Sequence, residues 1–335
     1  MNILIYGEAC RYGVAFPLKE AFEELGHKVV IFDWPQYLYT INQYTLKNRI
    51  LNRMLFHNIA RKINRDFINT FTNNHYDLLI VIRGNHIFPT TISAAKNFIK
   101  FVVNWNSDDF FNPLNSSQYI LQSFNKYDCI FTSRGHLKEE YIKRSAKRFE
   151  VLNWYYRPDM LLSNDKITNK KYIRDIVFIG SWSKRRENLL KSLENFDLKI
   201  WGAAWGRSSR SFRKKIEWNP PIYMESMMNV IASSKINVNI LTKENRDTTN
   251  IRNFEIPACG AFQLSERSEA ILELFEEDKE IVCFESAEEM VSKCKYYLKN
   301  ESERERIRLN GYQRLIQGNH SILDRARQIL KSVFN

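Results

Sequence analysis

Residues 252–267 read RNFEIPACGAFQLSER. They predict a short helix that begins with Arg252 and ends at Gly260, followed at once by a buried strand over residues 261–264. Glycine ends helices because it adopts positive φ without a Cβ penalty. The free N–H groups at the helix start favour an anionic ligand, for which Arg252 would add a bidentate clamp. Glu255, one turn later, is spaced to accept hydrogen bonds from sugar hydroxyls, so the stretch predicts a nucleotide-sugar site.

The spacing leaves a second interpretation open, because Arg-x-x-Glu on a helix is also the pattern of a surface ion pair. A resemblance favours the ligand site. The run 252–260 resembles the R-x-F-E-x-x-A-x-G segment of bacterial glycosyltransferases of the spore-maturation CgeB type, a branch of the two-domain GT-B fold. Further similar segments are DIVFIGSW at 175–182 with KRRE at 184–187, LKIWG at 198–202, SKINVN at 234–239 and EEDKEIVCF at 276–284.

Length and composition are those of a globular protein with two cores. A chain of 335 residues suits two domains of about 150 residues each, and the hydrophobic content is 44%. The sequence contains no run of 18 apolar residues, so it predicts no transmembrane helix. The apolar run at residues 1–6 is too short, and carries too little charge, to be a signal peptide. The five cysteines lack C-x-x-C spacing, which argues against a zinc site or disulfide framework. We therefore expect a cytoplasmic protein.

The formal charge is +12, and basic residues are spread over both halves. This favours basic faces that meet an anionic substrate, a membrane surface or nucleic acid. The range 47–65 predicts a basic amphipathic helix that contacts anionic lipid at the inner membrane face, or else a solvated helix packed on a core. Its basic residues are Lys47, Arg49, Arg53, Arg61, Lys62 and Arg65, and its apolar face is Leu51, Met54, Leu55 and Ile59. No nucleic-acid-binding motif is recognisable, so nucleic acid is not the expected partner.

Short apolar runs alternate with helical stretches in both halves, which predicts βαβ units and parallel sheets. The expected strands are 2–6, 29–32, 78–82, 101–105 and 129–132, then 176–179, 198–201, 236–240, 261–264 and 280–284. We therefore expect an α/β protein with two Rossmann-like domains. The resemblance implies the GT-B arrangement, with the domains facing a central cleft and the last helix crossing back to the first domain.

The expected boundaries follow from the polar, turn-rich stretch between the halves. Residues 1–155 form the N-terminal acceptor domain and 156–172 a linker. Residues 173–318 form the nucleotide-sugar-binding domain, and 319–335 the helix that packs back on the N-terminal domain.

Ligands of parallel sheets bind beyond the carboxyl ends of the strands, so the loops there carry the candidate residues. Gly180 lets a diphosphate approach the backbone, and the arginines behind it neutralise the phosphates, unless they only begin a solvated helix. Asp247 and Glu255 resemble the Glu-x7-Glu pair of many retaining GT-B enzymes, with Asp in place of the first Glu; the alternative is a turn-forming Asp. Residues 248–250 are expected to cap the next helix and direct N–H groups to the diphosphate. The donor-site candidates are Gly180, Ser181, Arg185, Arg186, Gly202, Asp247, Thr248, Thr249, Asn250, Arg252 and Glu255.

In the first half, Asp108 and Asp109 lie in the loop that follows the expected strand 101–105. One of them is predicted to deprotonate the acceptor hydroxyl, with a pKa raised by its neighbour's charge; the alternative is that they cap the next helix. Glu8 is a further candidate for catalysis. The candidates for acceptor binding are Gly7, Arg11, Arg83 and His86, where His86 is also a lesser base candidate.

Together these features predict a metal-independent glycosyltransferase without a cofactor. It would move a sugar from a nucleotide-diphosphate donor to a hydroxyl of a glycan, a lipid-linked intermediate or another cell-surface precursor. Arginines and helix N-termini would stabilise the leaving group. Two alternatives remain open: a basic nucleic-acid-binding protein or DNA-glycosylating transferase, and a non-catalytic nucleotide-binding scaffold.

Overall fold

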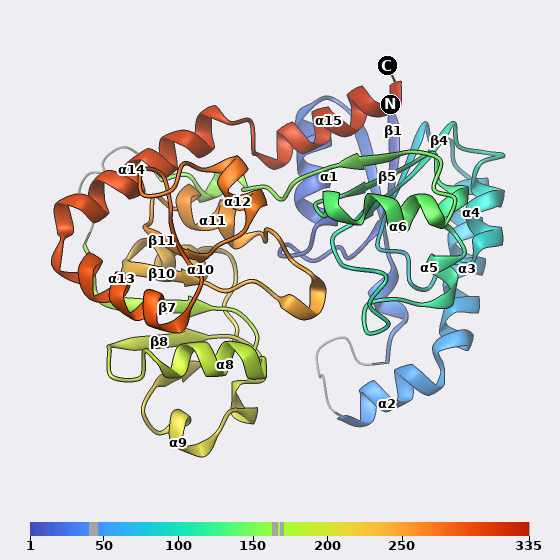
Figure 1. The fold of residues 1–335 in the computed structure, drawn as a ribbon. Coiled ribbons are helices and arrows are strands. Elements are labelled where there is room, and N and C mark those ends of the chain that lie inside the picture. Colours follow the sequence, from blue (N-terminus) through green and yellow to red (C-terminus); the bar gives the residue numbers. More distant parts are fainter. Residues whose placement is uncertain (40–45, 163–166, 168–170, 335) are drawn as a thin grey trace. The chain divides into compact units, whose positions relative to one another are not determined.

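The computed structural model describes residues 1–39, 46–162, 167 and 171–334 (Figure 1). The chain forms two compact units. The first comprises Met1–Asn153, Glu244–Arg246 and Ile322–Asn335, and the second comprises Trp154–Lys243 and Asp247–Ser321. Of the predicted linker, residues 163–166 and 168–170 lie outside the described residues, whereas Tyr156 and Met160 are buried in the core of the second unit.

The first unit contains a six-stranded parallel sheet with the order β2-β1-β3-β4-β5-β6. The strands are β1 (Asn2–Gly7), β2 (Lys28–Asp33), β3 (Leu78–Ile82), β4 (Phe101–Asn106), β5 (Cys129–Thr132) and β6 (Phe149–Val151). Strands β1, β3, β4 and β5 are almost wholly buried, as expected for a sheet with helices on both faces. The first five strands were predicted. The edge strand β6 was not, because its three residues include a charged one.

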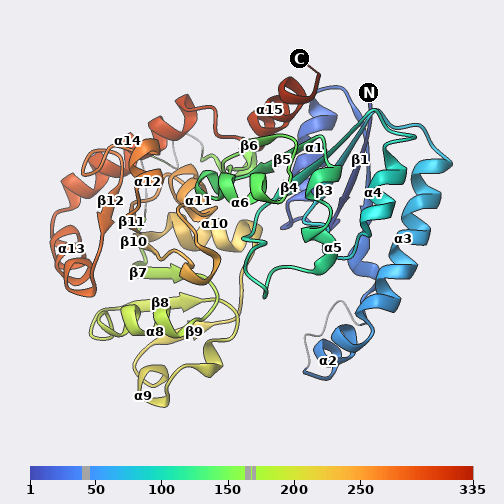
Figure 2. The same cartoon turned by 45° about the vertical axis from the view of Figure 1, so that its right-hand side comes forward.

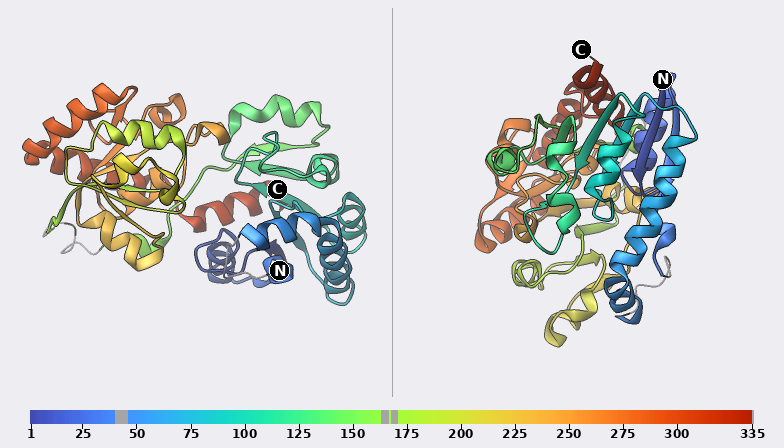
Figure 3. Two further views of the ribbon diagram at one scale, coloured as in Figure 1. Left: turned by 90° about the horizontal axis from the view of Figure 1, so that it is seen from below. Right: turned by 90° about the vertical axis from the view of Figure 1, so that its right-hand side faces the viewer.

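Helices cover both faces of this sheet (Figures 1 and 3). Helices α3 and α4 pack on the face that presents Leu4, Leu79 and Val102. Helix α15 packs beside α1 on the other face, and Phe334 contacts Phe101. The helices are α1 (Ala15–Glu24), α2 (Leu46–Met54), α3 (Phe56–Thr72), α4 (Pro89–Ala95), α5 (Gln118–Leu121), α6 (Lys138–Lys143) and α15 (Ile322–Phe334).

The prediction of a single helix over residues 47–65 is wrong. The chain forms two helices, α2 and α3, with Leu55 between them in a non-helical conformation. Ile59 and Ile63 of α3 are buried against the sheet, so that part of the predicted apolar face is confirmed. Met54 is instead 78% exposed, because the break turns α2 away from the core.

The second unit contains another six-stranded parallel sheet, ordered β12-β11-β10-β7-β8-β9. Its strands are β7 (Arg174–Ile179), β8 (Leu198–Trp201), β9 (Glu217–Asn219), β10 (Ser234–Asn239), β11 (Gln263–Glu266) and β12 (Val282–Phe284). Its helices are α8 (Lys184–Lys191), α9 (Arg210–Arg213), α10 (Met224–Ala232), α11 (Arg252–Ala258), α12 (Glu269–Leu274), α13 (Ala287–Lys299) and α14 (Glu301–Gln317). Strand β11 begins two residues later than predicted.

The strand orders locate where ligands should bind. Counted from β7, the second sheet has the order 3-2-1-4-5-6 of dinucleotide-binding folds, which reverses between β7 and β10. The first sheet reverses between β1 and β3. Ligands of such sheets bind at this reversal, outside the carboxyl ends of the strands. Each unit therefore has one expected binding edge.

Candidate functional site

Helix α11 begins at Arg252, as predicted, beside the reversal point of the second sheet. The Arg252 Nε donates to the carbonyl oxygen of Ile179, at the end of β7, over 3.4 Å. The guanidinium also forms an ion pair with Glu255, and both side chains are largely buried. This is the i,i+3 pair of the alternative interpretation, but it lies inside the unit rather than on its surface. Burial, together with the nearby charge of Arg186, lowers the pKa of Arg252 to about 10.

Arg186 bridges the loops that follow β7 and β10. It donates from Nη1 to the Ser181 carbonyl over 3.0 Å and from Nη2 to the Ile240 carbonyl over 2.8 Å. Arg185 forms a two-pronged ion pair with the buried Glu266 at the end of β11, with Nη1 3.1 Å from Oε2. Protein acceptors therefore already hold both predicted phosphate ligands. Arg185, Arg186 and Arg252 thus gather at the reversal point, and Arg185 and Arg252 each pair with a carboxylate there.

The two glycines predicted for the donor site allow two loops to approach each other closely. A Cβ on Gly202 would lie 1.9 Å from the Gly180 oxygen, so only glycine fits there. The same oxygen accepts a hydrogen bond from the Trp205 indole over 2.9 Å. The loops after β7 and β8 are thereby locked together.

Residues 248–250 do not cap α11, which corrects the prediction. The N-cap is Ile251, which offers no side-chain cap. The Asn250 side chain is instead paired with Asn239 of β10, through hydrogen bonds of 2.9 and 3.1 Å in opposite directions. The Asn250 N–H donates to the Asn253 side chain over 2.9 Å. That N–H is therefore occupied by the protein rather than directed to a ligand.

The other residues of this loop differ in how firmly they are held. The Asp247 N–H donates to the Thr242 carbonyl over 3.1 Å, and the Thr248 carbonyl accepts from the Ser268 hydroxyl. The Thr249 hydroxyl is buried and, among the described residues, has no hydrogen-bond partner. A buried hydroxyl without a partner costs free energy, which a ligand oxygen would relieve. Thr249 thus keeps its place as a candidate.

Glu187 of α8, the last residue of the KRRE segment but not a predicted site residue, anchors the loop after β7. Its fully buried carboxylate accepts hydrogen bonds from the Trp182 indole and the Ser209 N–H, each 3.0 Å long. Lys191 lies 3.2 Å from the same carboxylate. Burial alone would raise the pKa of Glu187, but the hydrogen bonds outweigh it and lower the pKa to about 2.

We expect Glu187→Gln to lower the free energy of unfolding at neutral pH by about 3 kcal/mol, which follows from the difference between the ordinary pKa of 4.5 and the folded pKa of about 2. Because the folded pKa is depressed, the stabilisation is present above the ordinary pKa of 4.5 and is lost as pH falls towards 2. Urea unfolding at a series of pH values measures both effects. The variant should show a flatter pH dependence in this acid window, and an unchanged slope would contradict the assignment.

In the first unit, the loop after β1 is ordered by packing and by a neighbouring strand. Gly7 lies close to α1, where a Cβ would come within 2.5 Å of the Ala15 side chain. The N–H of Ala9 donates to Asp33 at the end of β2 over 2.9 Å. Glu8 is half-buried near the Cys10 thiol, and Arg11 is exposed over the ring of Phe16.

The predicted residues Arg83 and Asp108 are brought together, with 2.7 Å between Nη2 and Oδ2. Arg83 has a φ of 62°, followed by Gly84 at 100°, and this left-handed turn directs the chain away from β3. Neither aspartate caps the next helix, α5, whose N-cap is Ser117. The carboxyl ends of β3 and β4 therefore share one ion pair.

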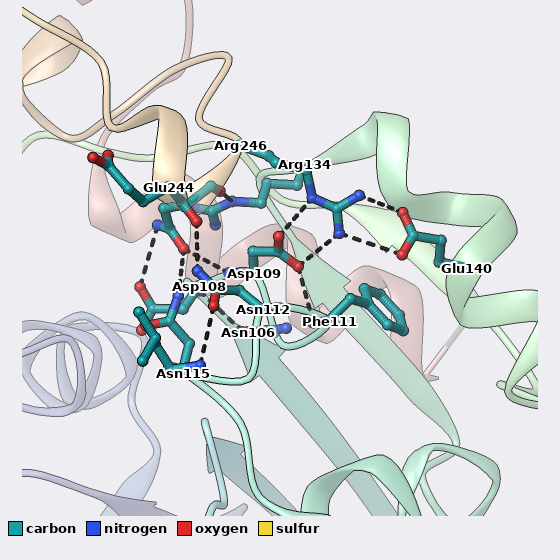
Figure 4. A network of polar contacts seen from close by, with 12 residues as sticks. Asn106, Asp108, Asp109, Phe111, Asn112, Asn115, Arg134, Glu140, Glu244 and Arg246 are labelled. Carbon is teal, nitrogen blue, oxygen red and sulfur yellow. Dashed lines mark hydrogen bonds and ion pairs between the residues drawn. The ribbon is translucent and has the colours of Figure 1, made fainter. Parts of the chain in front are cut away.

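Asp109 is buried in a polar network at the same edge (Figure 4). Arg246 holds its carboxylate with two hydrogen bonds, of 2.6 and 2.9 Å. The Phe111 N–H donates a third, over 2.9 Å. Burial raises the pKa of Asp109, but these hydrogen bonds outweigh it, so that the pKa is lowered. The expectation of a raised pKa is therefore wrong for Asp109, which is a poor base.

Asn245 joins the two aspartates. Its side-chain oxygen accepts the Asp109 N–H over 2.8 Å, and its side-chain nitrogen lies 3.4 Å from Asp108 Oδ1. The buried Arg134 donates to the Asn245 carbonyl over 3.0 Å and to the Ser107 carbonyl over 2.6 Å. Sequence reasoning missed Arg134, Asn245 and Arg246. Only Arg134 carried a signal, because it follows the predicted strand 129–132 by two residues.

His86 is packed rather than poised for chemistry. Its ring lies between those of Trp34 and Phe56, with centroids 4.8 and 4.7 Å away. Burial lowers its pKa to about 4, so the imidazole is neutral at pH 7. Among the described residues, no cluster of three or more His, Cys, Asp or Glu is arranged to hold a metal. Within the same residues, no helix is both long and apolar enough to cross a membrane.

Comparison with known proteins agrees with this geometry. Residues 185–331 match the model of a family described as glycosyl transferase-like. The chain is similar to sucrose-phosphate synthase from Thermosynechococcus elongatus, with a TM-score of 0.69 and 13% identity over 99% of this chain and 98% of that one. It is also similar to HepE of Anabaena in complex with UDP-glucose, with a TM-score of 0.66 and 11% identity over 99% of each chain.

The chain has the GT-B fold. A third similar structure, an alpha-glucosyltransferase in complex with UDP-glucose and DNA containing an abasic site, gives a TM-score of 0.64 and 15% identity over the whole of both chains. No curated protein matches the sequence. The predicted fold class is confirmed.

Proposed function

We propose that this protein is a glycosyltransferase of the CgeB type. It moves a sugar from a nucleotide-diphosphate donor to a hydroxyl of a glycan, a lipid-linked intermediate or another cell-surface precursor. The observation that carries the proposal is the buried Arg252–Glu255 pair at the strand-order reversal of the second sheet. The UDP-glucose bound to one structural neighbour favours a UDP-sugar.

The donor's diphosphate contacts the three arginines that gather at this reversal, Arg252, Arg185 and Arg186. When the bond between the anomeric carbon and the phosphate oxygen breaks, the leaving diphosphate gains negative charge. Arginines fixed by surrounding acceptors stabilise that charge without reorganising, which lowers the barrier. Glu255, one turn into α11, accepts hydrogen bonds from the ribose. Gly180, Ser181, Gly202 and residues 247–250 complete the proposed donor site.

The acceptor hydroxyl loses its proton to Asp108 as its oxygen bonds to the anomeric carbon. Asp108 is the proposed base because its carboxylate, though paired with Arg83, is partly exposed to an acceptor, whereas the carboxylate of Asp109 is buried against Arg246. Asp109 therefore shapes the loop, and Glu8 is the second candidate for the base. Gly7, Arg11, Arg83 and His86 are the proposed acceptor contacts.

A screen of nucleotide sugars by thermal shift tests the proposal. A specific ligand binds only the folded protein and raises its stability by about 2.7 kcal/mol at one hundred times its Kd. We expect one UDP-sugar to raise the melting temperature well above the effect of inorganic pyrophosphate. Absence of any shift with UDP, GDP, CMP and dTDP sugars would contradict a donor site.

We also propose that transfer needs neither a metal nor a cofactor, because arginines supply the positive charge that a divalent ion would supply. Activity with the identified donor should therefore be unchanged in EDTA. The measurement is the initial rate before and after chelation, and then with Mn²⁺ or Mg²⁺ restored. Loss on chelation with recovery on adding either ion would reject the metal-free mechanism.

A DNA-glycosylating activity is the second candidate, favoured by the +12 charge and by the DNA-bound alpha-glucosyltransferase among the similar structures. Binding of DNA through phosphate contacts falls steeply with salt. A salt-sensitive gel shift together with sugar transfer to DNA would establish this candidate instead. Nucleotide binding without transfer to any acceptor would indicate a non-catalytic scaffold.

A further inference from the structure

The segment between Asp33 and Asp66 has an unusual charge. Residues 34–65 contain six basic side chains and no acidic one. Among the segment's described aromatic residues, Trp34, Tyr37 and Phe56 pack within the first unit, whereas Tyr39 is exposed. An aromatic ring with a polar edge suits a membrane interface. Helix α2 lies within this segment. Its surroundings therefore combine positive charge with apolar groups.

Three large apolar side chains are exposed around α2. Ile50 is 51% exposed and Met54 is 78% exposed, and they lie one turn apart on the same face of the helix. Tyr39 is 48% exposed, and its backbone is tied to Asn52 of α2 by hydrogen bonds of 2.9 and 3.4 Å. A monomeric protein normally leaves such side chains scattered rather than grouped.

Two exposed cations flank this apolar stripe. Lys47 precedes Ile50 by three positions and Arg53 follows it by three, so both lie beside it on the helix surface. Among the described residues, neither lies within ion-pair distance of a carboxylate. By contrast, Arg65 of α3 is paired with Asp66, 2.8 Å away. The charges beside the stripe are thus unneutralised.

The rest of the segment is anchored. Leu55 packs against the core of the first unit, and Ile59 and Ile63 of α3 are part of that core. Helix α2 extends beyond this core, on the side where the strands of the first sheet end (Figures 1 and 2). The two interpretations of the predicted helix therefore apply to different parts: α3 is a packed helix, whereas α2 presents an apolar face to solvent.

We propose that α2 binds the surface of an anionic lipid bilayer. Tyr39, Ile50 and Met54 would enter the boundary between headgroups and acyl chains, while Lys47 and Arg53 contact lipid phosphates. Basic and apolar groups on one helix suit this interface, where both kinds of group are satisfied. A nucleic acid would use the cations but leave Ile50 and Met54 without a role.

The position of α2 would bring a lipid to the acceptor residues. Phe56, the first residue of α3, packs on His86, with 4.7 Å between ring centroids. A lipid-linked acceptor held at α2 would therefore arrive at the edge that carries Arg83 and Asp108. This consequence rests on the proposed function, whereas lipid binding itself does not.

Co-sedimentation with vesicles tests the proposal. The full-length protein should bind vesicles of phosphatidylglycerol mixed with phosphatidylcholine, and bind pure phosphatidylcholine much more weakly. Lys47→Gln/Arg53→Gln should weaken anionic binding by about 30-fold, from the attraction of each cation to an anionic surface. Ile50→Asn/Met54→Asn should weaken it by about tenfold at unchanged charge, because burial of apolar groups contributes separately.

Matched controls remove the same kinds of side chain elsewhere. Ile142→Asn replaces an isoleucine that is 54% exposed on α6, and Arg210→Gln/Lys214→Gln removes two exposed cations at α9; both should bind as the wild type does. Wild-type affinity in the α2 variants, equal binding to neutral vesicles, or loss of DNA binding in place of vesicle binding would each overturn the proposal. Melting temperatures verify folding. A UDP-sugar should raise the melting temperature of the α2 variants as much as that of the wild type. Loss of vesicle binding with this thermal shift retained then concerns α2 alone, whereas loss of the thermal shift concerns the proposed transferase.

Discussion

Asp108→Asn is expected to lower kcat by about 10²–10⁴-fold, the usual contribution of a general base. The carboxylate is partly exposed beside Arg83, at the edge where the first sheet's strands end. An amide of nearly the same size keeps the shape of the loop but cannot take the acceptor's proton. Donor affinity should stay unchanged, since the proposed donor residues belong to the other unit. Steady-state kinetics with donor and acceptor varied separately would measure this.

Asp109→Asn is the matched control. It removes the charge that Arg246 contacts, so stability should fall by about 1.5–3 kcal/mol, the value of hydrogen bonds to charged groups. Turnover of the folded fraction should fall far less than in Asp108→Asn. If Asp108→Asn retains near-normal turnover, Asp108 is not the base, and Glu8→Gln becomes the next variant to measure.

Arg252→Ala is expected to weaken diphosphate binding by about 1.5–3 kcal/mol, since it removes a charge-assisted contact. It should also destabilise the fold by about 3–5 kcal/mol, because Glu255 would remain as a buried carboxylate without its partner. Titration calorimetry with UDP and with pyrophosphate measures the first effect. Urea unfolding measures the second.

The double variant Arg252→Ala/Glu255→Gln separates the two effects. Stability should recover because no buried charge remains, whereas pyrophosphate affinity should stay low. Glu255→Ala alone should weaken UDP but not pyrophosphate, because its proposed partner is ribose. Full pyrophosphate affinity in the double variant would show that Arg252 has only a structural role.

The fold was predictable because its central strands are short apolar runs buried on both faces, such as residues 78–82 and 129–132. The spacing of the apolar residues and the turn residues between them were enough to place these strands along the chain. The edge strands β6 and β9 were missed because each has only three residues, among which Glu150 and Glu217 are polar. The break between α2 and α3 was missed because Leu55 continues the helical pattern of apolar residues, and the surrounding core decides its conformation.

The candidate site was predictable only where local spacing decides the contact. The pairing of Arg252 with Glu255 is of this kind, since three positions on a helix bring side chains together. The contact between Arg246 and Asp109 spans 137 positions. No local pattern encodes such a partner, because tertiary packing brings the loop of Glu244–Arg246 to the aspartates. Asn245 and the buried Arg134 were not predicted for the same reason.

The division of the first unit into three chain segments affects how the protein is made. Its last helix, α15, closes the unit through Arg148, which donates to the Ser332 carbonyl over 2.6 Å, and through Arg325, which donates to the Asn153 carbonyl over 2.9 Å. A ribosome adding about 5–20 residues per second delivers this helix roughly 10–40 s after residue 153. Throughout that interval the nascent first unit exposes the surface on which Ile322, Ala326 and Ile329 later pack. Synthesis from the N-terminus thus starts this unit before the second one and completes it only with α15, so we expect chaperones to bind the surface exposed in the meantime.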